Sequence, residues 1–119
     1  MFDVTSASLH SAMRGLSARR DAVANNIANV ETGGYLAQRV DFEGTLDAAL
    51  DSARRGDRGA VNGVAPEAST SLAATRLNGN NVNLDDEIVM QEQTELAYAT
   101  VLEAMNAKFR LLRTAINGQ

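Results

Sequence analysis

The single histidine lies among serine residues. A serine hydroxyl can act as a nucleophile and a histidine as its base. His10 has Ser8 two positions before it and Ser11 directly after it. Residues one or two apart on a helix point in different directions, so these side chains do not form a nucleophile and base pair. One histidine also excludes a multi-histidine metal site, and the absence of cysteine excludes a thiol nucleophile and a disulfide. We therefore do not expect an enzyme.

Acidic residues cluster at one point, where Asp85, Asp86 and Glu87 follow an asparagine-rich segment. An enzyme with a carboxylate site built from these three residues is one alternative hypothesis. Residues 78–87 also have some features of a calcium loop, but the glycine is not at the sixth position and no glutamate is at the twelfth. Capping of a following helix explains the cluster better, because acidic side chains stabilise a helix N-terminus. We predict no metal, no cofactor and no small-molecule substrate.

Composition excludes further classes of function. The chain has 119 residues, a formal net charge of −4 and only 4% aromatic residues. An acidic chain lacks a broad basic surface for phosphate backbones, so we predict no nucleic-acid partner. No run of about 20 apolar residues is available to cross a bilayer, and the first residues lack the basic and apolar regions of a secretory signal. We expect one domain that is not inserted in a membrane and that, if exported, keeps its N-terminus uncleaved.

An apolar stripe runs along the N-terminal part of the chain. Alternating steps of four and three residues connect Leu9, Met13, Leu16, Arg20, Val23, Ile27 and Val30. This spacing is typical of a helix with a coiled-coil seam. We predict that the helix begins near Thr5 or Ser6, either of which can cap it, and ends before Gly33 and Gly34. The charge of Arg20 within the seam pairs with the facing helix or a neighbouring chain, or else its stem snorkels to solvent.

A longer stripe with the same spacing runs through the C-terminal third. It comprises Leu84, Ile88, Gln91, Glu95, Tyr98, Leu102, Met105, Phe109, Leu112 and Ile116. Asn83 is placed to cap this helix, and Lys108, Arg110 and Arg113 near its end favour the helix dipole. At 1.5 Å per residue, a helix over residues 84–116 would be about 50 Å long.

These two helices define the predicted fold, an all-α chain whose long N- and C-terminal helices pair as an antiparallel coiled-coil hairpin. We assign residues 1–32 to the N-terminal helix, 33–82 to a loop-rich central region and 83–119 to the C-terminal helix. In the central region, residues 35–42 have strand character and residues 42–53 favour a short helix, while residues 51–81 are expected to be mobile. Gly15 weakens the first helix, but a small residue there would let another backbone approach.

A two-helix hairpin with one seam on each helix buries too little surface to offset the chain entropy of folding comfortably. Small scaffolds of this kind usually need a staple, and this chain has neither a disulfide nor a metal constellation. We predict that the staple is other copies of the chain or other chains. The alternative is that the central region folds back over the apolar face.

Two segments carry a resemblance to a known family. Residues 24–35, ANNIANVETGGY, resemble the N-terminal signature of bacterial flagellar rod, hook and related axial proteins. Residues 80–87, Tyr98 and residues 108–116 are similar to the proximal rod members of that family. Gly33 stands where the family usually has proline, so the turn after the first helix is expected to be less rigid here.

The resemblance implies a structural subunit of the proximal rod of the flagellar basal body, which stacks helically through its terminal helices, crosses the periplasm and transmits torque. It also implies export through the flagellar type III apparatus. The implied partners are copies of itself, FlgC-like rod proteins, a FliE-like adaptor and the inner-membrane ring. Two other hypotheses are a different axial rod protein such as FlgC and a small soluble helical-hairpin binding module.

Several polar and aromatic residues have both a functional and a purely structural interpretation. The amides of Asn25, Asn26 and Asn29 either cross-link the backbones of adjacent subunits or belong to a fraying helix end. Tyr35 and Phe42 either anchor a contact between subunits or cover the end of the hairpin. The full set of predicted assembly and packing residues is Leu9, Met13, Leu16, Arg20, Val23, Asn25, Asn26, Ile27, Asn29, Tyr35, Phe42, Ile88, Tyr98, Leu102, Met105, Phe109, Leu112 and Ile116.

Overall fold

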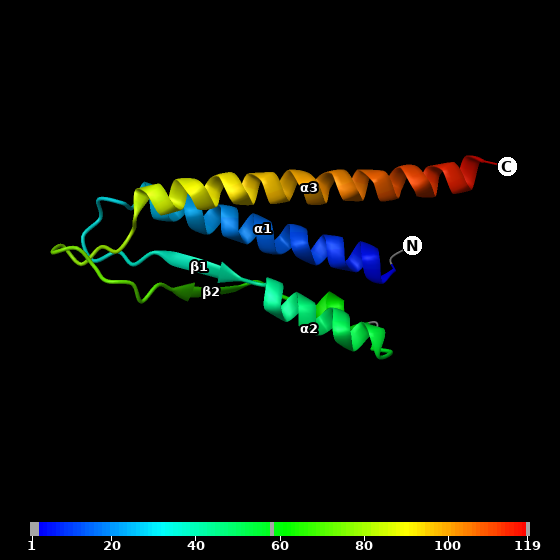
Figure 1. Cartoon of the computed structure of the whole chain (residues 1–119), viewed down its shortest axis with the longest axis horizontal. Helices are drawn as coiled ribbons and strands as arrows, with labels where there is room; N and C mark the ends of the chain where they lie inside the picture. The colour runs from blue at the N-terminus through cyan, green and yellow to red at the C-terminus, as the bar shows by residue number, and fades with distance from the viewer. Residues whose placement is uncertain (1–2, 58, 119) are drawn as a thin grey trace.

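The computed structural model describes residues 3–57 and 59–118 of the chain. In chain order the elements are α1 (Val4–Ala28), β1 (Gln38–Asp41), α2 (Glu43–Arg54), the short 3-10 helix η1 (Ala60–Gly63), β2 (Glu67–Thr70) and α3 (Leu84–Asn117). The molecule is elongated, with principal extents of 66 × 29 × 14 Å, and α1 lies between α3 and a layer made of the sheet and α2 (Figure 1). Within the described residues, no helix is both long and apolar enough to cross a membrane.

The long N-terminal helix begins earlier than the sequence suggested. Asp3 is its N-cap, and the side-chain oxygen of Asp3 accepts a hydrogen bond from the Ser6 backbone N–H at 2.8 Å. Thr5 and Ser6, the predicted caps, lie inside the first turn. Aspartate is among the best N-cap residues, because its carboxylate also favours the positive end of the helix dipole.

The long C-terminal helix has the predicted limits to within one residue. It spans Leu84–Asn117, and the Asn83 side chain accepts hydrogen bonds from the backbone N–H groups of Asp85 and Asp86 at 3.1 and 3.4 Å. Several sequence features favour this helix: a good N-cap, acidic residues in the first turn and no glycine or proline before its end.

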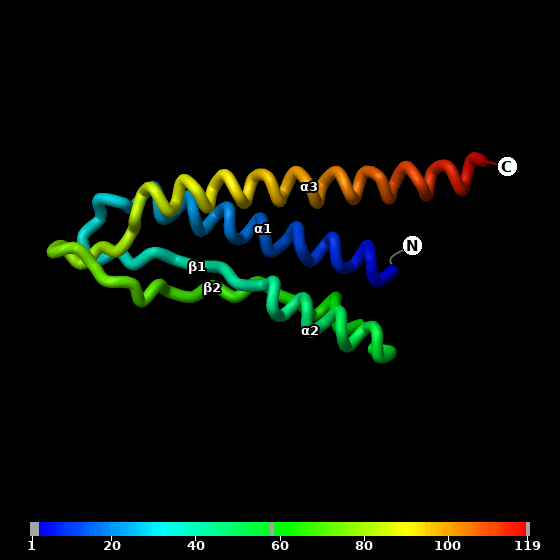
Figure 2. The backbone as a smooth tube through the Cα atoms, viewed as in Figure 1, coloured from blue at the N-terminus to red at the C-terminus, as the bar shows by residue number. Residues whose placement is uncertain are grey.

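The chain is mostly helical but not purely so, which corrects the all-α prediction. β1 and β2 form a two-stranded antiparallel sheet in which Gln38 is paired with Thr70 and Asp41 with Glu67. The predicted short helix is present as α2. Residues 51–81, predicted to be mobile, contain the end of α2, η1 and β2, so the central region returns along α1 (Figure 2).

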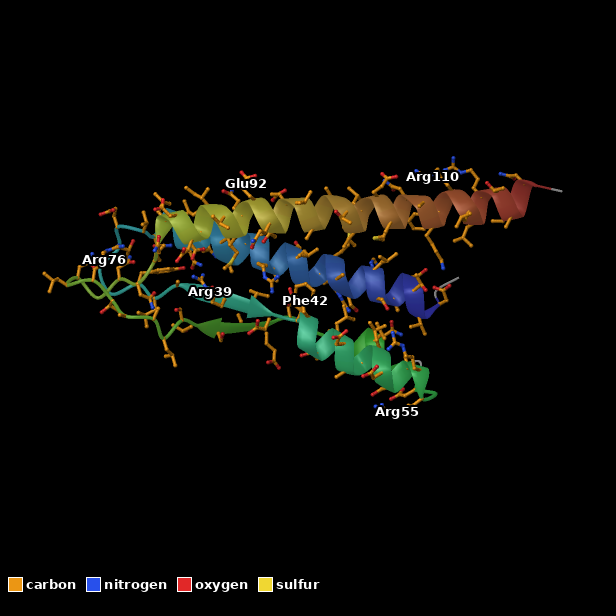
Figure 3. All side chains as sticks on the ribbon, viewed as in Figure 1. Arg39, Phe42, Arg55, Arg76, Glu92 and Arg110 are labelled. Atoms are coloured by element: carbon orange, nitrogen blue, oxygen red, sulfur yellow. The ribbon has the colours of Figure 1, made fainter. Side chains whose placement is uncertain are left out.

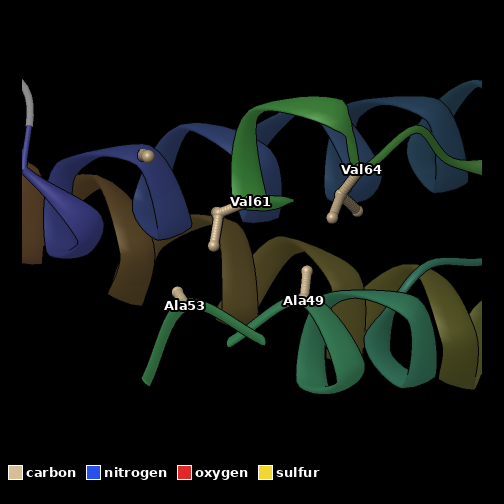
Figure 4. Packing of buried hydrophobic residues seen from close by; sticks show 5 residues of the cluster. Ala49, Ala53, Val61 and Val64 are labelled. Atoms are coloured by element: carbon tan, nitrogen blue, oxygen red, sulfur yellow. The ribbon is translucent and has the colours of Figure 1, made fainter. Parts of the chain in front are cut away.

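Two apolar clusters hold the layers together. In the first, Ala7 of α1 packs with Ala49 and Ala53 of α2 and with Val61 and Val64 in and beside η1 (Figure 4). In the second, Leu16, Ala22, Val40 and Phe42 join α1 to β1 and the start of α2, and Tyr98 and Val101 of α3 pack against them. Small side chains predominate on α1, so the central region can lie close to this helix.

Candidate assembly site

One buried asparagine connects three parts of the chain. Asn26 is fully buried near the end of α1, and its Nδ2 donates hydrogen bonds to the Gln38 carbonyl at 2.9 Å and to Glu87 Oε2 at 3.0 Å. Its Oδ1 accepts hydrogen bonds from the Gln38 N–H at 2.8 Å and from the Tyr35 hydroxyl at 3.1 Å. By bonding both the N–H and the carbonyl of Gln38, the amide occupies the edge of β1 where another strand would bind.

This contact corrects the predicted role of Asn26. A primary amide has two donor hydrogens and two acceptor lone pairs, and all four are used within the chain. The amide therefore cross-links segments of one subunit and has no further group for a neighbour. Asn25 is exposed, and the side chain of the half-buried Asn29 donates to the Asn25 carbonyl and accepts from the Thr32 hydroxyl.

The carboxylate beside Asn26 is also buried. Glu87, on α3, has no exposed surface, and its Oε1 lies 2.7 Å from Arg39 Nη1 of β1. This is an ion-pair distance, although the N–H does not point well at the oxygen and Oε1 accepts no aligned hydrogen bond. A buried carboxylate is costly unless paired, so Arg39 and Asn26 together determine where α3 can lie against β1. Burial, and then the negative charge of Glu87, raise the pKa of the Tyr35 hydroxyl.

The arrangement around Glu87 does not make a carboxylate site. Asp85 and Asp86 are exposed at the helix start, whereas the Glu87 side chain is buried on the face toward α1 and β1. Among the described residues, no group of three or more acidic, histidine or cysteine side chains is arranged to hold a metal. The acidic cluster is divided between a helix terminus and a structural ion pair.

Two further asparagines fasten the loops at this end, and sequence analysis missed them. Asn80 donates to the carbonyls of Asn29 and Thr32, both at 2.8 Å, and accepts from the Val82 N–H at 2.7 Å. Asn81 accepts from the Ala37 N–H at 2.7 Å and donates to the carbonyls of Ser71 and Ala73. Both side chains are buried, so the asparagine-rich run serves loop closure, while Asn83 alone caps α3.

Gly15 has a specific partner, the ring of Phe42. A Cβ at position 15 would lie 2.3 Å from ring atoms of Phe42, so only glycine leaves room for this contact. Figure 3 places Phe42 between α1 and the start of α2, where the ring is 4% exposed. A side chain, rather than another backbone, fills the space that Gly15 provides. Arg19 lies over the same ring at 5.0 Å from its centroid.

Arg20 is paired with the facing helix, one of the alternatives predicted. Its guanidinium contacts the Glu95 carboxylate at 2.7 and 3.1 Å and lies 4.1 Å from the centroid of the Tyr98 ring. Both charged side chains are substantially exposed, so the ion pair adds little stability. Its main effect is on how α1 and α3 are aligned along their length.

A second ion pair joins the start of α1 to the far part of α3. Lys108 Nζ donates to Asp3 Oδ2 at 2.6 Å. The hydrogen bond from Lys108, followed by the one from the Ser6 backbone, lowers the pKa of Asp3 from 3.8 to about 2. Beside the sheet, the Arg19 guanidinium lowers the pKa of the Glu43 carboxyl through their hydrogen bonds.

The predicted assembly residues fall into three groups by burial. Those buried within the chain are Leu16, Val23, Asn26 and Phe42. Those half-buried are Leu9, Met13, Arg20, Ile27, Asn29, Tyr35, Tyr98, Met105 and Leu112. Those exposed are Asn25, Ile88, Leu102, Phe109 and Ile116.

The exposed apolar residues lie along α3. Leu102 is 43%, Phe109 54% and Ile116 75% exposed. The line of α3 that faces α1 is offset from the predicted seam, because the buried residues of this helix are Glu87 and Thr94. Near the start of α1, Leu9 lines a small groove with the α3 residues Met105, Phe109 and Leu112.

Known proteins resemble this chain in sequence. Residues 8–35 match the family model for flagella basal body rod proteins. The flagellar basal body rod protein FlgB of Bacillus subtilis (strain 168) is 30% identical over 125 residues, covering 99% of this chain and 97% of the relative. The chain belongs to the FlgB family of flagellar basal body rod proteins. FlgB of Borrelia hermsii is 25% identical over 132 residues, covering 98% of each chain.

Membership of the FlgB family excludes the hypothesis of a carboxylate enzyme, because this family is structural. As a rod protein, the chain is a component of the flagellar basal body. The matched segment 8–35 contains Gly15, Arg20 and Asn26, and therefore includes the α1 residues that contact Phe42, Glu95 and Glu87.

Proposed function

We propose that this FlgB-family protein is a subunit of the proximal rod that assembles helically through its terminal helices and transmits torque. In the proposed subunit, α1 and α3 pair as an antiparallel coiled-coil hairpin. Three contacts support this pairing, from Asn26 to Glu87, from Arg20 to Glu95 and from Asp3 to Lys108. Their order along α3 is the reverse of their order along α1, as two antiparallel helices require.

The observation that carries the assembly proposal is the apolar surface left on α3. Leu102, Phe109 and Ile116 lie at heptad spacing and remain at least 43% exposed. Burying a large apolar side chain fully contributes about 1.5 to 3 kcal/mol, so a line of them favours association strongly when repeated over many subunits. A rod that carries torque needs many such contacts acting together.

The proposed partners follow from the place of the subunit in the rod. They are copies of the chain, FlgC-like rod proteins, a FliE-like adaptor and the inner-membrane ring. The subunit would reach the rod through the flagellar export apparatus with its N-terminus uncleaved and would lie in the rod that crosses the periplasm.

A pair of substitutions on α3 tests this proposal. Leu102→Asp and Phe109→Asp place a charge in the proposed contact, and a charge buried without a partner costs several kcal/mol. We expect each variant to be absent from purified basal bodies and to abolish swimming in a strain lacking the native gene. Leu72→Asp is the matched control, because Leu72 is 97% exposed and lies between β2 and α3, outside the long helices.

The helical content of each purified variant, measured by circular dichroism, separates failed assembly from failed folding. If a folded Leu102→Asp or Phe109→Asp subunit entered basal bodies in normal amount and supported swimming, the apolar face of α3 would not be the assembly surface.

A further inference from the structure

A second stripe with heptad spacing runs along the side of α3 that faces away from α1. From Asp85, alternating steps of four and three residues lead through Val89, Glu92 and Leu96 and continue to Arg110 and Arg113. Every position on this outer stripe is exposed. Figure 3 shows Glu92 and Arg110 projecting from the same side of α3, where no other element covers the helix.

Charge along α3 is segregated by sign. The sequence has no lysine or arginine between Arg76 and Lys108, and no aspartate or glutamate after Glu103. The outer stripe therefore carries its acids, Asp85, Glu92 and Glu103, in its first two thirds and its bases, Arg110 and Arg113, at its end, where Glu103 borders the basic segment.

Most of these charges have no ion-pair partner among the residues that the structure describes. In the described part of the chain, ion pairs connect none of Asp85, Glu92 and Arg113 to an opposite charge. Arg110 pairs only with Glu103 at the surface, with both side chains more than 60% exposed. Between the charged ends, Val89 is 55% and Leu96 72% exposed, which gives the stripe an apolar component.

We propose that the outer stripe is a contact between copies of this chain, in which the basic end of one α3 lies beside the acidic start of the next. This inference rests on the proposed helical assembly, in which neighbouring copies have the same direction. Two parallel α3 helices in register would place acid against acid and base against base. An offset of about 20 residues, or about 30 Å along the helix, brings Arg110 and Arg113 beside Glu92 of the neighbour.

The offset has a structural consequence for the rod. Each subunit uses the two ends of α3 for two different neighbours, so the contact is heterologous and propagates rather than closing into a dimer. Charge then specifies the axial stagger, while the apolar residues between the charges supply contact area.

Two charge-reversal variants test the contact. One carries Arg110→Glu and Arg113→Glu, and the other carries Asp85→Lys and Glu92→Lys. In sedimentation experiments on the full chain, we expect the wild type to form a concentration-dependent series of oligomers that dissociates at high salt. We expect each variant alone to associate at least about tenfold more weakly, and an equimolar mixture to recover the series, because the altered ends are complementary again. Arg54→Glu on α2 is the matched control, since it reverses an exposed, surface-paired arginine outside the stripe.

Cysteines distinguish the stagger from other arrangements, and the natural chain contains none. Position 117 lies 21 residues after position 96 on the same stripe. We expect disulfides to form when Leu96→Cys and Asn117→Cys chains are mixed, and not within either variant alone. Dimers of either single variant would indicate helices in register and would overturn the stagger.

Other results would also overturn the inference. These are a wild type that stays monomeric at high concentration, a discrete dimer that does not grow, full association of either charge variant alone, or a mixture that fails to recover association. The rod role itself is judged separately by the fate of the Leu102→Asp and Phe109→Asp variants in basal bodies. If those variants are excluded from basal bodies while charge reversal has no effect, the apolar assembly surface stands and only the contact through the outer stripe is wrong.

Discussion

Replacing Asn26 by alanine should destabilise the subunit far more than replacing its neighbour Asn25. The substitution removes all four hydrogen bonds of the amide. The hydrogen bonds to the Tyr35 hydroxyl and to the Gln38 N–H and carbonyl are part-buried, so water can partly replace them. Glu87 Oε2, on a side chain with no exposed surface, loses its hydrogen-bond donor without replacement.

The lost hydrogen bonds set the expected magnitude. A hydrogen bond between neutral groups contributes roughly 0.5 to 1.5 kcal/mol, and a hydrogen bond to a charged group roughly 1.5 to 3 kcal/mol. We therefore expect Asn26→Ala to lower the free energy of unfolding by roughly 3 to 5 kcal/mol. Asn25→Ala, at an exposed helix position, should change it by less than about 0.5 kcal/mol.

Urea unfolding followed by circular dichroism measures both variants under the same conditions. The slope of the transition should stay constant, so that a shift in midpoint reports stability alone. If Asn26→Ala were as stable as Asn25→Ala, the amide would not hold α1, β1 and α3 together as we infer.

Two further predictions concern contacts at other points on α1. Gly15→Ala should destabilise the chain by about 1 to 3 kcal/mol, despite the better helix propensity of alanine, because the new Cβ would overlap the Phe42 ring. In a double-mutant cycle its effect should disappear in a Phe42→Ala background, and an unchanged effect there would refute the steric explanation. The Asp3 carboxyl should titrate by NMR at about pH 2, and Lys108→Gln should move this midpoint toward 3.8. Because folding lowers the pKa of Asp3, the contribution of its carboxylate to the free energy of unfolding is complete above pH 3.8 and is lost as the pH falls through about 2. A titration midpoint near 3.8 in the wild type would exclude the contact with Lys108.

The sequence could predict the α-helices and the N-cap of α3, because these depend on residues that are close together along the chain. Asn83 and the acidic residues after it indicated where α3 begins, and the uninterrupted heptad spacing indicated its length. The predicted strand character of residues 35–42 is confirmed by β1, but β2 and the pairing of the two strands escaped prediction because they are about 30 residues apart and their pairing depends on the close approach of the central region to α1.

Polar burial was the main source of error in the predicted site. Glu87 was assigned to a helix N-terminus and Asn80 and Asn81 were missed, because charged and amide side chains are usually exposed and all three are buried here. The apolar stripe of α3 was centred on its largest residues, yet Glu87 and Thr94 are the residues that α3 buries. Leu102 and Phe109 therefore lie beside the buried line of α3 and remain 43% and 54% exposed.

The two ends of the helix pair differ in how they are held. At one end, Asn26, Asn80 and Asn81 use most of their hydrogen-bonding groups within the subunit, so its loops close without help. At the other end, α3 continues beyond the contact between Asp3 and Lys108 with apolar and basic side chains exposed. Polar groups satisfied internally impose one geometry on the subunit, whereas apolar surface without cover favours association. We infer that the asparagine network shapes each subunit before it joins the rod and that neighbours complete the end of α3.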